Sequence, residues 1–258
     1  MTRSYAIGDI HGHLTDLKRA HTWVNADRAR VNDTDSPLIH LGDLIDRGPD
    51  SRGVVQYLMD GMAAGEPWLV IKGNHDRYLT KFIAEMTVSD SAVKSGLLWF
   101  HPRLGGDKTL ASYGVTATDG APLMPIHAAA LKSVPQTHLD FLQNLPLYHL
   151  RGEVLFVHAG IRPGVDLADQ TEHDLLWIRE GFLNDTTDHG PLVVHGHTAL
   201  NLPLHYGNRV DLDAGAGYGQ PITAAVLEDR HVQLLTATGR ADIQHSQPPT
   251  TLPDPNAY

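Results

Sequence analysis

The sequence predicts an α/β fold, in which buried strands alternate with helices. Five short runs rich in Val, Ile and Leu each lead into a glycine beside Asp, Asn or His, and closed apolar runs of this kind are typical of buried strands. Helical patterns lie between the early runs. Sheets of this class bind ligands beyond the carboxyl ends of their strands, and all five polar clusters follow a predicted strand.

The predicted strands and the motifs that close them follow in chain order. They are residues 4–7 before GDIHG, 37–41 before GDLIDRG, 68–71 before KGNHD, 154–157 before HAG, and 191–194 before HGHT. A single Asp or His beside a glycine usually reflects turn chemistry. Five such clusters at one edge of a sheet are much harder to explain as turns, so we expect them to form one functional site.

Two helices are predicted between the first three strands. Residues 14–27 carry Leu14, Leu17 and Trp23 at roughly helical spacing. Residues 51–65, SRGVVQYLMDGMAAG, end at a glycine, which is a common helix stop. The alternation of strand and helix supports the α/β prediction.

Composition limits the class of function. A chain of 258 residues forms one large α/β domain or two small ones. Its formal net charge of -10 argues against a general nucleic-acid or membrane-surface binder, because both need basic patches; a small anionic substrate is still allowed. Cysteine is absent, so a metal site must use His, Asn and carboxylates. We see neither a signal peptide nor an apolar run near the ~20 residues of a membrane span, and expect a cytoplasmic protein.

The polar clusters contain residue types that bind divalent metal ions. Asp9 and His11 are two positions apart, and in an extended segment their side chains would point to one side. Asp43, after the second strand, could bridge to a second metal. The oxygen and nitrogen ligands after the later strands are Asn74, His158 and His197. Two metals about 3.5–4 Å apart are the usual clamp for phosphate-ester hydrolysis, because they activate a water molecule to hydroxide and neutralise the phosphate.

Three further residues fit the remaining steps of such a reaction. Arg47 carries a planar guanidinium that matches phosphate oxygens. His75 directly follows Asn74 and is placed to protonate a leaving oxygen. A carboxylate partner would orient this ring and keep it protonated near neutral pH, and Asp46 is the candidate.

The motif series GDIHG, GDLIDRG, GNHD, VHAG and HGHT closely resembles the calcineurin-like metallophosphoesterases. Within them it is similar to the phosphoprotein phosphatase branch, which includes bacterial serine/threonine phosphatases and symmetrical diadenosine tetraphosphatases. The DRG of the second motif distinguishes this branch. The resemblance covers roughly residues 1–198, and RVDLDAGAGYG at 209–219 resembles the late strand and loop of bacterial members. It implies a two-sheet sandwich flanked by helices.

The resemblance also implies roles for individual residues. Metal one would lie on Asp9 and His11 with Asp43 bridging, and the implied ligands of metal two are Asn74, His158 and His197. His75 would be the general acid paired with Asp46. Arg47 and Asn74 would contact phosphate, and DLLWIRE matches the segment that carries a second phosphate-binding arginine, here Arg179. For Arg179 a solvated position on a surface helix is the alternative.

Two questions about the site stay open from the sequence. We expect manganese, with iron, zinc, cobalt or nickel as alternatives, because mixed oxygen and imidazole ligands suit all of them. His195 lies two residues before His197. We take His197 as the ligand because it precedes Thr in GHT, and we expect His195 to lie behind the ligands or in the core.

We expect a single domain over residues 1–245, with a helical and loop insert at about 82–150 that forms a cap over the metal site, and a proline-rich tail at 246–258. The rings of Trp99, Phe100 and Tyr113 could stack on an adenine, although such aromatics more often form the core of a cap. The stretch LGGDKT superficially suggests a phosphate loop, but the GxxxxGK[ST] pattern is missing.

Three functions remain open. We favour slightly a serine/threonine phosphoprotein phosphatase, with a symmetrical diadenosine tetraphosphate hydrolase as the alternative. The motif GNHD, with Asp76 where many protein phosphatases have Glu, is frequent in the tetraphosphatases and weakens the first assignment. An inactive scaffold with the same fold is the third possibility, and the filled ligand positions argue against it. We expect a phosphoprotein or nucleotide substrate, no nucleic-acid polymer and no membrane partner.

Overall fold

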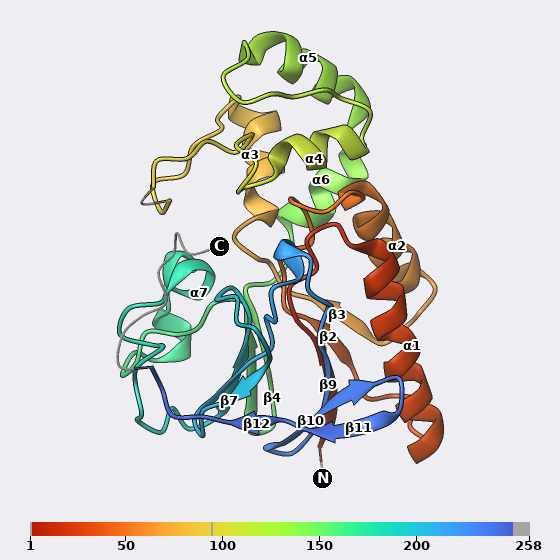
Figure 1. Ribbon diagram of the computed structural model, residues 1–258, viewed down its shortest axis with the longest axis vertical. Coiled ribbons are helices and arrows are strands. Elements are labelled where there is room, and N and C mark those ends of the chain that lie inside the picture. Colours follow the sequence, from red (N-terminus) through yellow and green to blue (C-terminus); the bar gives the residue numbers. More distant parts are fainter. Residues whose placement is uncertain (1, 94, 250–258) are drawn as a thin grey trace.

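The computed structural model describes residues 2–93 and 95–249, and its centre is a pair of six-stranded sheets (Figure 1). In spatial order the first sheet consists of β11 (Gly239–Asp242), β10 (His231–Thr236), β9 (Ala224–Glu228), β1 (Arg3–Ile7), β2 (Leu38–His40) and β3 (Trp68–Val70). The second consists of β12 (Gln244–His245), β7 (Leu204–His205), β8 (Arg209–Asp211), β6 (Leu192–His195), β5 (Val154–Val157) and β4 (Tyr148–Arg151).

The two sheets pack face to face. Ile39 and Ala225 of the first sheet share one buried apolar cluster with Phe156, Val194 and Val210 of the second. These strands are buried on both faces, which is why their sequences are continuous apolar runs rather than alternating ones. The chain therefore has the two-sheet sandwich flanked by helices that the motif series predicted.

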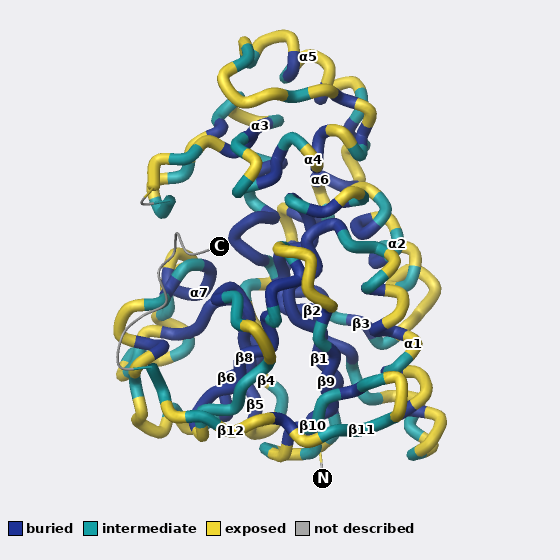
Figure 2. The backbone as a smooth tube through the Cα atoms, viewed as in Figure 1, coloured by how far each residue is buried: buried dark blue, intermediate teal, exposed yellow. Residues whose placement is uncertain are grey.

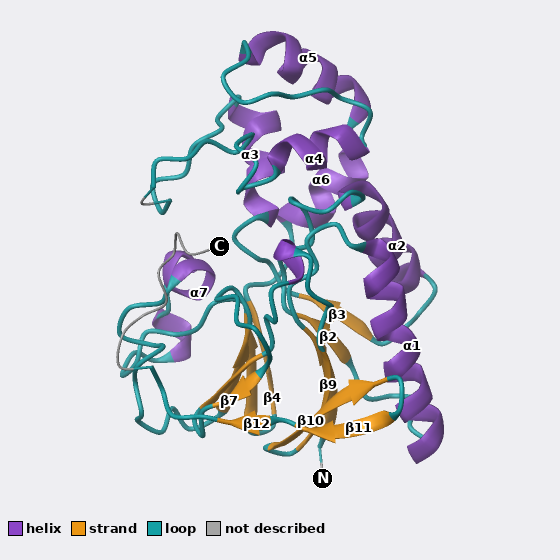
Figure 3. Cartoon of the chain, in the orientation of Figure 1, coloured by secondary structure: helices purple, strands orange, loops and turns teal. Residues whose placement is uncertain are grey.

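Helices cover the outer faces of the sandwich (Figure 3). The helices α1 (Leu14–Val31) and α2 (Ser51–Ala63) pack on the first sheet. On the outer face of the second sheet, Leu175 of α7 (Glu172–Trp177) shares a buried cluster with Leu155 and Val193. The two short 3-10 turns of the described chain are η1 (Leu167–Asp169) and η2 (Ala216–Tyr218), and Ala216 of η2 packs in the cluster of the first sheet.

The five predicted strands are confirmed, and no strand end differs from the prediction by more than one residue. Pairing of β1 with β2 and of β2 with β3 is parallel, as is pairing of β5 with β6, so their carboxyl ends meet at one edge. The helix predicted at 14–27 extends to Val31, and Asn32 ends it in the left-handed conformation with φ 53°. The helix predicted at 51–65 ends at Ala63.

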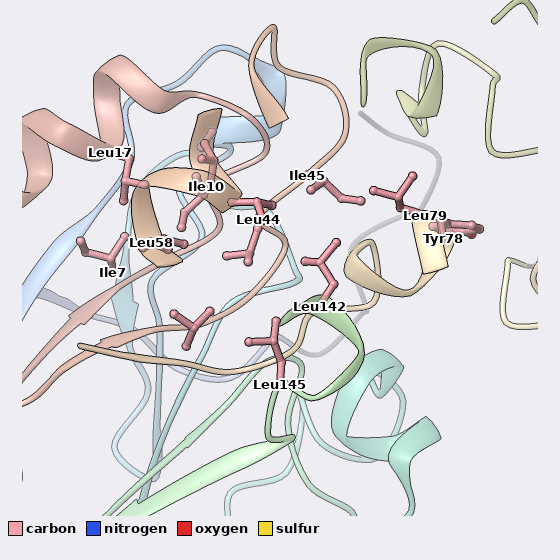
Figure 4. Packing of buried hydrophobic residues seen from close by; sticks show 14 of the residues in the cluster. Ile7, Ile10, Leu17, Leu44, Ile45, Leu58, Tyr78, Leu79, Leu142 and Leu145 are labelled. Atoms are coloured by element: carbon pink, nitrogen blue, oxygen red, sulfur yellow. The ribbon is translucent and has the colours of Figure 1, made fainter. Parts of the chain in front are cut away.

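The insert at residues 82–150 contains the end of α3 (Asp76–Glu85), followed by α4 (Gly106–Ser112), α5 (Leu123–Ser133) and α6 (Gln136–Gln143). It lies above the carboxyl ends of the strands (Figure 1). Its core is not separate, because Leu142 and Leu145 pack in the same cluster as Leu44 and Ile45 of the second motif (Figure 4). The tube coloured by burial shows buried chain running from the first sheet into the insert (Figure 2).

The three aromatic residues of the insert that could have stacked on an adenine are buried. Trp99 is 0% exposed, and Phe100 and Tyr113 belong to the same cluster. Their rings form the core of the insert and are not available to stack on an adenine in this arrangement. Of the predicted tail, residues 250–258 lie outside the described part of the chain. No helix in the described ranges is long and apolar enough to cross a membrane.

An ion-pair network ties α1 to the far edge of the first sheet. Arg240 of β11 donates from Nε and Nη2 to Asp27 of α1 at 2.8 and 2.9 Å, and from Nη1 to Glu228 of β9 at 3.0 Å. The hydrogen bond from Arg240 lowers the pKa of Glu228. Burial would raise the pKa of Asp27, but bonds from Arg240 and Arg30 outweigh burial and lower this pKa.

Replacing Arg240 with Met should therefore destabilise the fold in a pH-dependent way. Lowered carboxyl pKa values contribute stability above the unfolded pKa near 4, and this contribution is lost as pH falls. We expect the free energy of unfolding at pH 7 to fall by about 1.5–3 kcal/mol, with the difference from wild type shrinking below about pH 4. Urea unfolding across pH measures it.

The control for this prediction is Arg30→Met. Arg30 bonds the same Asp27 at 2.8 Å, but its side chain is 55% exposed. Its loss should cost less than about 1 kcal/mol, because exposed ion pairs contribute little. Equal losses in the two variants, or a pH-independent loss for Arg240→Met, would contradict this account of the network.

Candidate metal and phosphate site

The structure brings the predicted site residues together at the carboxyl ends of parallel strands of both sheets. The loop after β1 supplies Asp9 and His11, the loop after β2 supplies Asp43, Asp46 and Arg47, and the loop after β3 supplies Asn74 and His75. His158 follows β5 and His197 follows β6. All six residues proposed as metal ligands are buried, with His197 the most exposed at 8%.

Asp43 lies between two groups of ligand atoms. Its Oδ2 is 3.5 Å from His11 Nε2, and its Oδ1 is 3.4 Å from His158 Nε2. Ligand atoms within 4.8 Å of one another form two sets that could each hold a metal, one of His11, Asp43 and His75 and the other of Asp9, Asp43 and His158. Asp43 belongs to both sets, which is the position a bridging ligand requires.

A second cluster of donors surrounds the Asn74 side chain. Asn74 Oδ1 lies 2.8 Å from His158 Nε2 and 2.7 Å from His197 Nδ1. These are the three residues expected to hold a second metal. The remaining ring nitrogen, His197 Nε2, is buried without a hydrogen-bond partner in the described structure.

Backbone carbonyls orient two of these rings toward the site. His11 Nδ1 lies 3.0 Å from the Ile45 carbonyl, and His158 Nδ1 lies 2.8 Å from the Leu41 carbonyl. A carbonyl only accepts, so each Nδ1 carries the hydrogen and each Nε2 lone pair faces Asp43. Burial also lowers the pKa of His11 and of His197 well below the usual range. Neutral rings with a lone pair on Nε2 are the form that binds metal ions.

The carboxylates of the site also favour a bound cation. Burial, together with the neighbouring Asp213 and Asp43, raises the pKa of Asp9 well above its ordinary value. Ionised carboxylates packed together away from water repel one another unless a cation lies between them. The donor set of buried carboxylates, one amide oxygen and neutral imidazoles thus fits divalent metals.

The geometry corrects one part of the prediction. Strand β1 ends at Ile7, and His11 has φ 46°, so Asp9 and His11 do not lie in an extended segment. A turn brings their side chains together instead. Left-handed backbone also occurs at Asp43, Asp46, Arg47 and His197. Non-glycine residues adopt it at a cost, and such strain concentrates at functional sites whose surroundings enforce it.

Glycines are required beside the ligands because neighbouring side-chain and backbone atoms approach their Cα atoms closely. A Cβ at Gly73 would overlap the Asp43 backbone and carboxylate, and a Cβ at Gly196 would overlap Asp9 Oδ1. Only a residue without a side chain allows such close approach, within the first sheet at Gly73 and between the two sheets at Gly196.

His75 and Asp46 form a buried pair. His75 Nδ1 lies 2.7 Å from Asp46 Oδ2. Two residues of the insert also donate to this carboxylate, Trp99 through its indole Nε1 and Thr109 through its hydroxyl. The residue pattern did not predict either contact; the only signal was LGGDKT, which lacks a phosphate-loop pattern yet carries Thr109.

Two arginines line the cavity above the ligands. This cavity has a volume of about 730 Å³ and includes Asp43, Asn74 and His75 in its walls. Arg47 donates from Nη1 to His11 Nε2 at 2.8 Å, and its guanidinium lies 4.7 Å from the Tyr218 ring centre. Arg179 follows α7, donates to the His197 carbonyl at 3.2 Å and lines the same cavity. Arg179 therefore does not lie on a solvated helical face.

His195 lies behind the site. Its ring is 0% exposed, with Nε2 3.1 Å from Arg209 Nη1 and Nδ1 3.0 Å from the Gly196 carbonyl. It joins neither set of potential metal ligands in the described residues. Asp213 and Tyr218 of the late segment 209–219 do reach the cavity, although the motifs assigned them no role.

Asp76 connects the loops that carry the ligands. Its Oδ1 accepts from the Leu44 backbone N–H at 2.8 Å, and its Oδ2 accepts from the Gly73 N–H at 2.8 Å. Both oxygens are thus occupied as acceptors, and the residue is fully buried. The Asp of GNHD fixes the second motif to the third.

Comparisons with known proteins agree with this geometry. A family model described as "Calcineurin-like phosphoesterase" matches residues 2–237. An asymmetrical bis(5'-nucleosyl)-tetraphosphatase of Bacillus subtilis (strain 168) is 25% identical over 237 residues, covering 84% of this chain and 87% of the relative. A symmetrical one of Dechloromonas aromatica (strain RCB) is 30% identical over 160 residues, covering 62% of this chain and 44% of the relative.

Solved structures are similar in fold. A putative diadenosine tetraphosphatase has a TM-score of 0.59 at 23% identity and covers 91% of this chain and 93% of its own. A cold-active protein-tyrosine phosphatase of a psychrophilic Shewanella species has a TM-score of 0.59 at 14% identity and covers 95% of this chain and 81% of its own.

Replacing Asp76 with Asn should destabilise the protein, because an amide offers one acceptor oxygen where two N–H groups must be satisfied. We expect the free energy of unfolding to fall by about 1–3 kcal/mol, the cost of an unsatisfied buried group. Asp50→Asn is the matched control, since Asp50 caps α2 by accepting from Gly53 N–H alone, and Asn is an equally good cap. Chemical unfolding measures both variants, and equal stabilities would contradict this role of Asp76.

Proposed function

This chain belongs to the calcineurin-like phosphoesterase family, and we propose that it is a two-metal phosphoester hydrolase whose substrate is a dinucleoside polyphosphate. The family assignment makes it a metal-dependent phosphoric ester hydrolase. The observation that carries the mechanism is the position of Asp43 between two groups of ligand atoms, beneath the arginines of the cavity. The nucleotide substrate is supported by relatives that cover 84% of this chain and are named for that activity.

The six buried ligand residues would hold two divalent ions. Asp9, His11 and Asp43 would hold one ion, and Asp43 would share the other with Asn74, His158 and His197. We propose manganese as the first ion to test. When bound, such ions activate a water molecule and neutralise the phosphate charge. An inactive scaffold is disfavoured, because each ligand position carries a competent side chain.

The residues of the cavity would bind and orient the phosphate chain. Arg47 and Arg179 lie on its walls, and guanidinium groups match phosphate oxygens in pairs. The phosphorus–oxygen bond to the leaving group breaks as water attacks from the opposite side.

His75 would protonate the leaving oxygen from Nε2. Its Nδ1 is held by Asp46, so only Nε2 is directed toward the arginine and the cavity. Burial lowers the pKa of His75 to about 3, although the carboxylate of Asp43 opposes this effect. Burial also raises the pKa of Asp46 to about 7. Negative charge on a phosphate bound beside Nε2 would favour the doubly protonated ring, which is the form able to donate a proton.

The phosphoprotein substrate, which the motifs favoured slightly, ranks second. Structural neighbours that act on proteins share the fold at 14–15% identity, which carries no information on substrate. The nucleotide relatives are similar along most of both chains, so we place the dinucleotide first.

A competition experiment tests the substrate. The manganese-loaded protein is mixed with equimolar phosphoserine peptide and diadenosine tetraphosphate, and the products are separated by chromatography. We expect nucleotide products, either two ADP or ATP with AMP, and an intact peptide. Asp43→Asn is the control, because loss of the shared ligand should abolish turnover and lower the manganese content. Dephosphorylated peptide beside intact dinucleotide would contradict the nucleotide proposal.

The acid role is tested with His75→Asn. We expect turnover of esters with poor leaving groups to fall by about 10²–10⁴-fold, the range for general acid catalysis, while esters with good leaving groups lose less and manganese content is unchanged. His127→Asn is the matched control, because His127 bonds the Ile83 carbonyl in the insert, outside the cavity walls. Equal losses for both classes of ester would remove His75 from this role.

A further inference from the structure

We infer that Trp99 and Thr109 of the insert are positioning residues for the catalytic acid, because they fix the Asp46 carboxylate that holds His75. The inference rests on the proposed acid role of His75. It assigns to the insert a part in catalysis itself, in addition to the covering of the cavity that the sequence predicted.

The Asp46 carboxylate is enclosed by donors. Trp99 Nε1 lies 3.0 Å from Oδ1 and 2.9 Å from Oδ2, Thr109 Oγ1 donates to Oδ1 at 2.6 Å, and His75 Nδ1 lies 2.7 Å from Oδ2. Asp46 is 0% exposed, so no water competes for these positions. The Thr109 hydroxyl holds Oδ1, and the Trp99 indole contacts both oxygens. These contacts fix one orientation of the carboxylate, in which Oδ2 faces His75.

Thr109 also holds the backbone of Asp46. Its hydroxyl accepts from the Asp46 backbone N–H at 2.8 Å and lies 3.0 Å from Ser51 Oγ. A hydroxyl has one hydrogen to donate and two lone pairs, and all three are used here. Asp46 has left-handed backbone with φ 74°. The hydrogen bond to Thr109 helps to hold this strained backbone conformation.

The two insert residues are fixed to each other. The Gly106 backbone N–H donates to the Trp99 carbonyl at 2.9 Å, and a Cβ at Gly106 would overlap the indole. The absence of a side chain there lets the first turn of α4 rest on the indole, and Thr109 follows three residues later in that helix. The other side of Trp99 stacks on Tyr78, with ring centres 6.0 Å apart and planes at 6°.

Residues 99–109 also support Arg47, the neighbouring residue proposed to bind phosphate. The Arg47 backbone N–H donates to the Gly105 carbonyl at 3.3 Å, and Arg47 Nε donates to the Arg103 carbonyl at 3.2 Å. A Cβ at Gly105 would overlap the Arg47 backbone. Residues 99–109 therefore surround both Asp46 and Arg47, and the second motif depends on the insert for its shape.

The inference is tested by comparing leaving groups in the manganese-loaded full chain. Trp99→Phe removes the indole N–H and keeps an aromatic ring against Tyr78. Thr109→Val removes the hydroxyl at nearly constant volume, and Thr109→Ser retains it. The substrates are phenyl phosphate, with a poor leaving group, and p-nitrophenyl phosphate, with a good one. Elemental analysis gives the manganese content of each variant.

We expect Trp99→Phe and Thr109→Val to lower kcat for phenyl phosphate about 10-fold or more and for p-nitrophenyl phosphate less than about 3-fold. Manganese content should be unchanged, and Thr109→Ser should behave as wild type. In a His75→Asn background neither substitution should lower kcat further, because residues that act as a unit are not additive. Tyr113→Phe is the structural control, since its hydroxyl bonds His138 within the insert.

Equal losses for the two substrates, or a further loss in the His75→Asn background, would overturn the inference and leave these residues a structural role. The Thr109→Val and Thr109→Ser pair decides the outcome if Trp99→Phe does not fold. Failure of the underlying mechanism is distinguishable. A His75→Asn protein without a leaving-group effect overturns both the acid role and this inference, whereas a normal effect at His75 with none at Trp99 and Thr109 overturns this inference alone.

Discussion

The Asp43 carboxylate is the point at which the two halves of the sandwich meet. One oxygen lies 3.5 Å from His11 of the first sheet, the other lies 3.4 Å from His158 of the second, and Oδ1 also accepts from the His75 backbone N–H at 2.9 Å. These contacts require left-handed backbone at Asp43 and a glycine at position 73. The close approach of the strand ends, and with it the geometry of the site, depends on this one carboxylate being buried between the sheets.

The strands and the clustering of the candidate site residues were predictable because both follow local rules. Apolar runs of four or five residues closed by glycine specify buried strands, and parallel strands place their following loops at one edge. The turn that joins Asp9 to His11 was not predictable in this way, because the left-handed backbone at His11 is imposed by hydrogen bonds that the turn donates to the Asp43 loop. The His11 N–H donates to the Asp43 carbonyl at 2.7 Å.

The support of Asp46 could not be predicted for a different reason. Trp99 and Thr109 are separated from Asp46 by 53 and 63 positions, and long-range contacts leave no periodic pattern in a sequence. An aromatic residue and a threonine in an insert are typical of packing and of helix formation. Only the arrangement in space shows that both donate to the carboxylate that bonds His75.

The shared hydrophobic cluster and the contacts of residues 99–109 limit how this chain can diverge. Exchange of the whole insert with that of a relative would remove the donors to Asp46 along with the old cavity wall. Residues 92, 93, 95 and 97 line the cavity ahead of the stretch that contacts Asp46, whereas Arg103 and Leu104 line it from within that stretch. Changes of substrate specificity are therefore expected at residues 92, 93, 95 and 97, which can vary without loss of the donors to Asp46. Replacement of the whole insert would disturb the site itself.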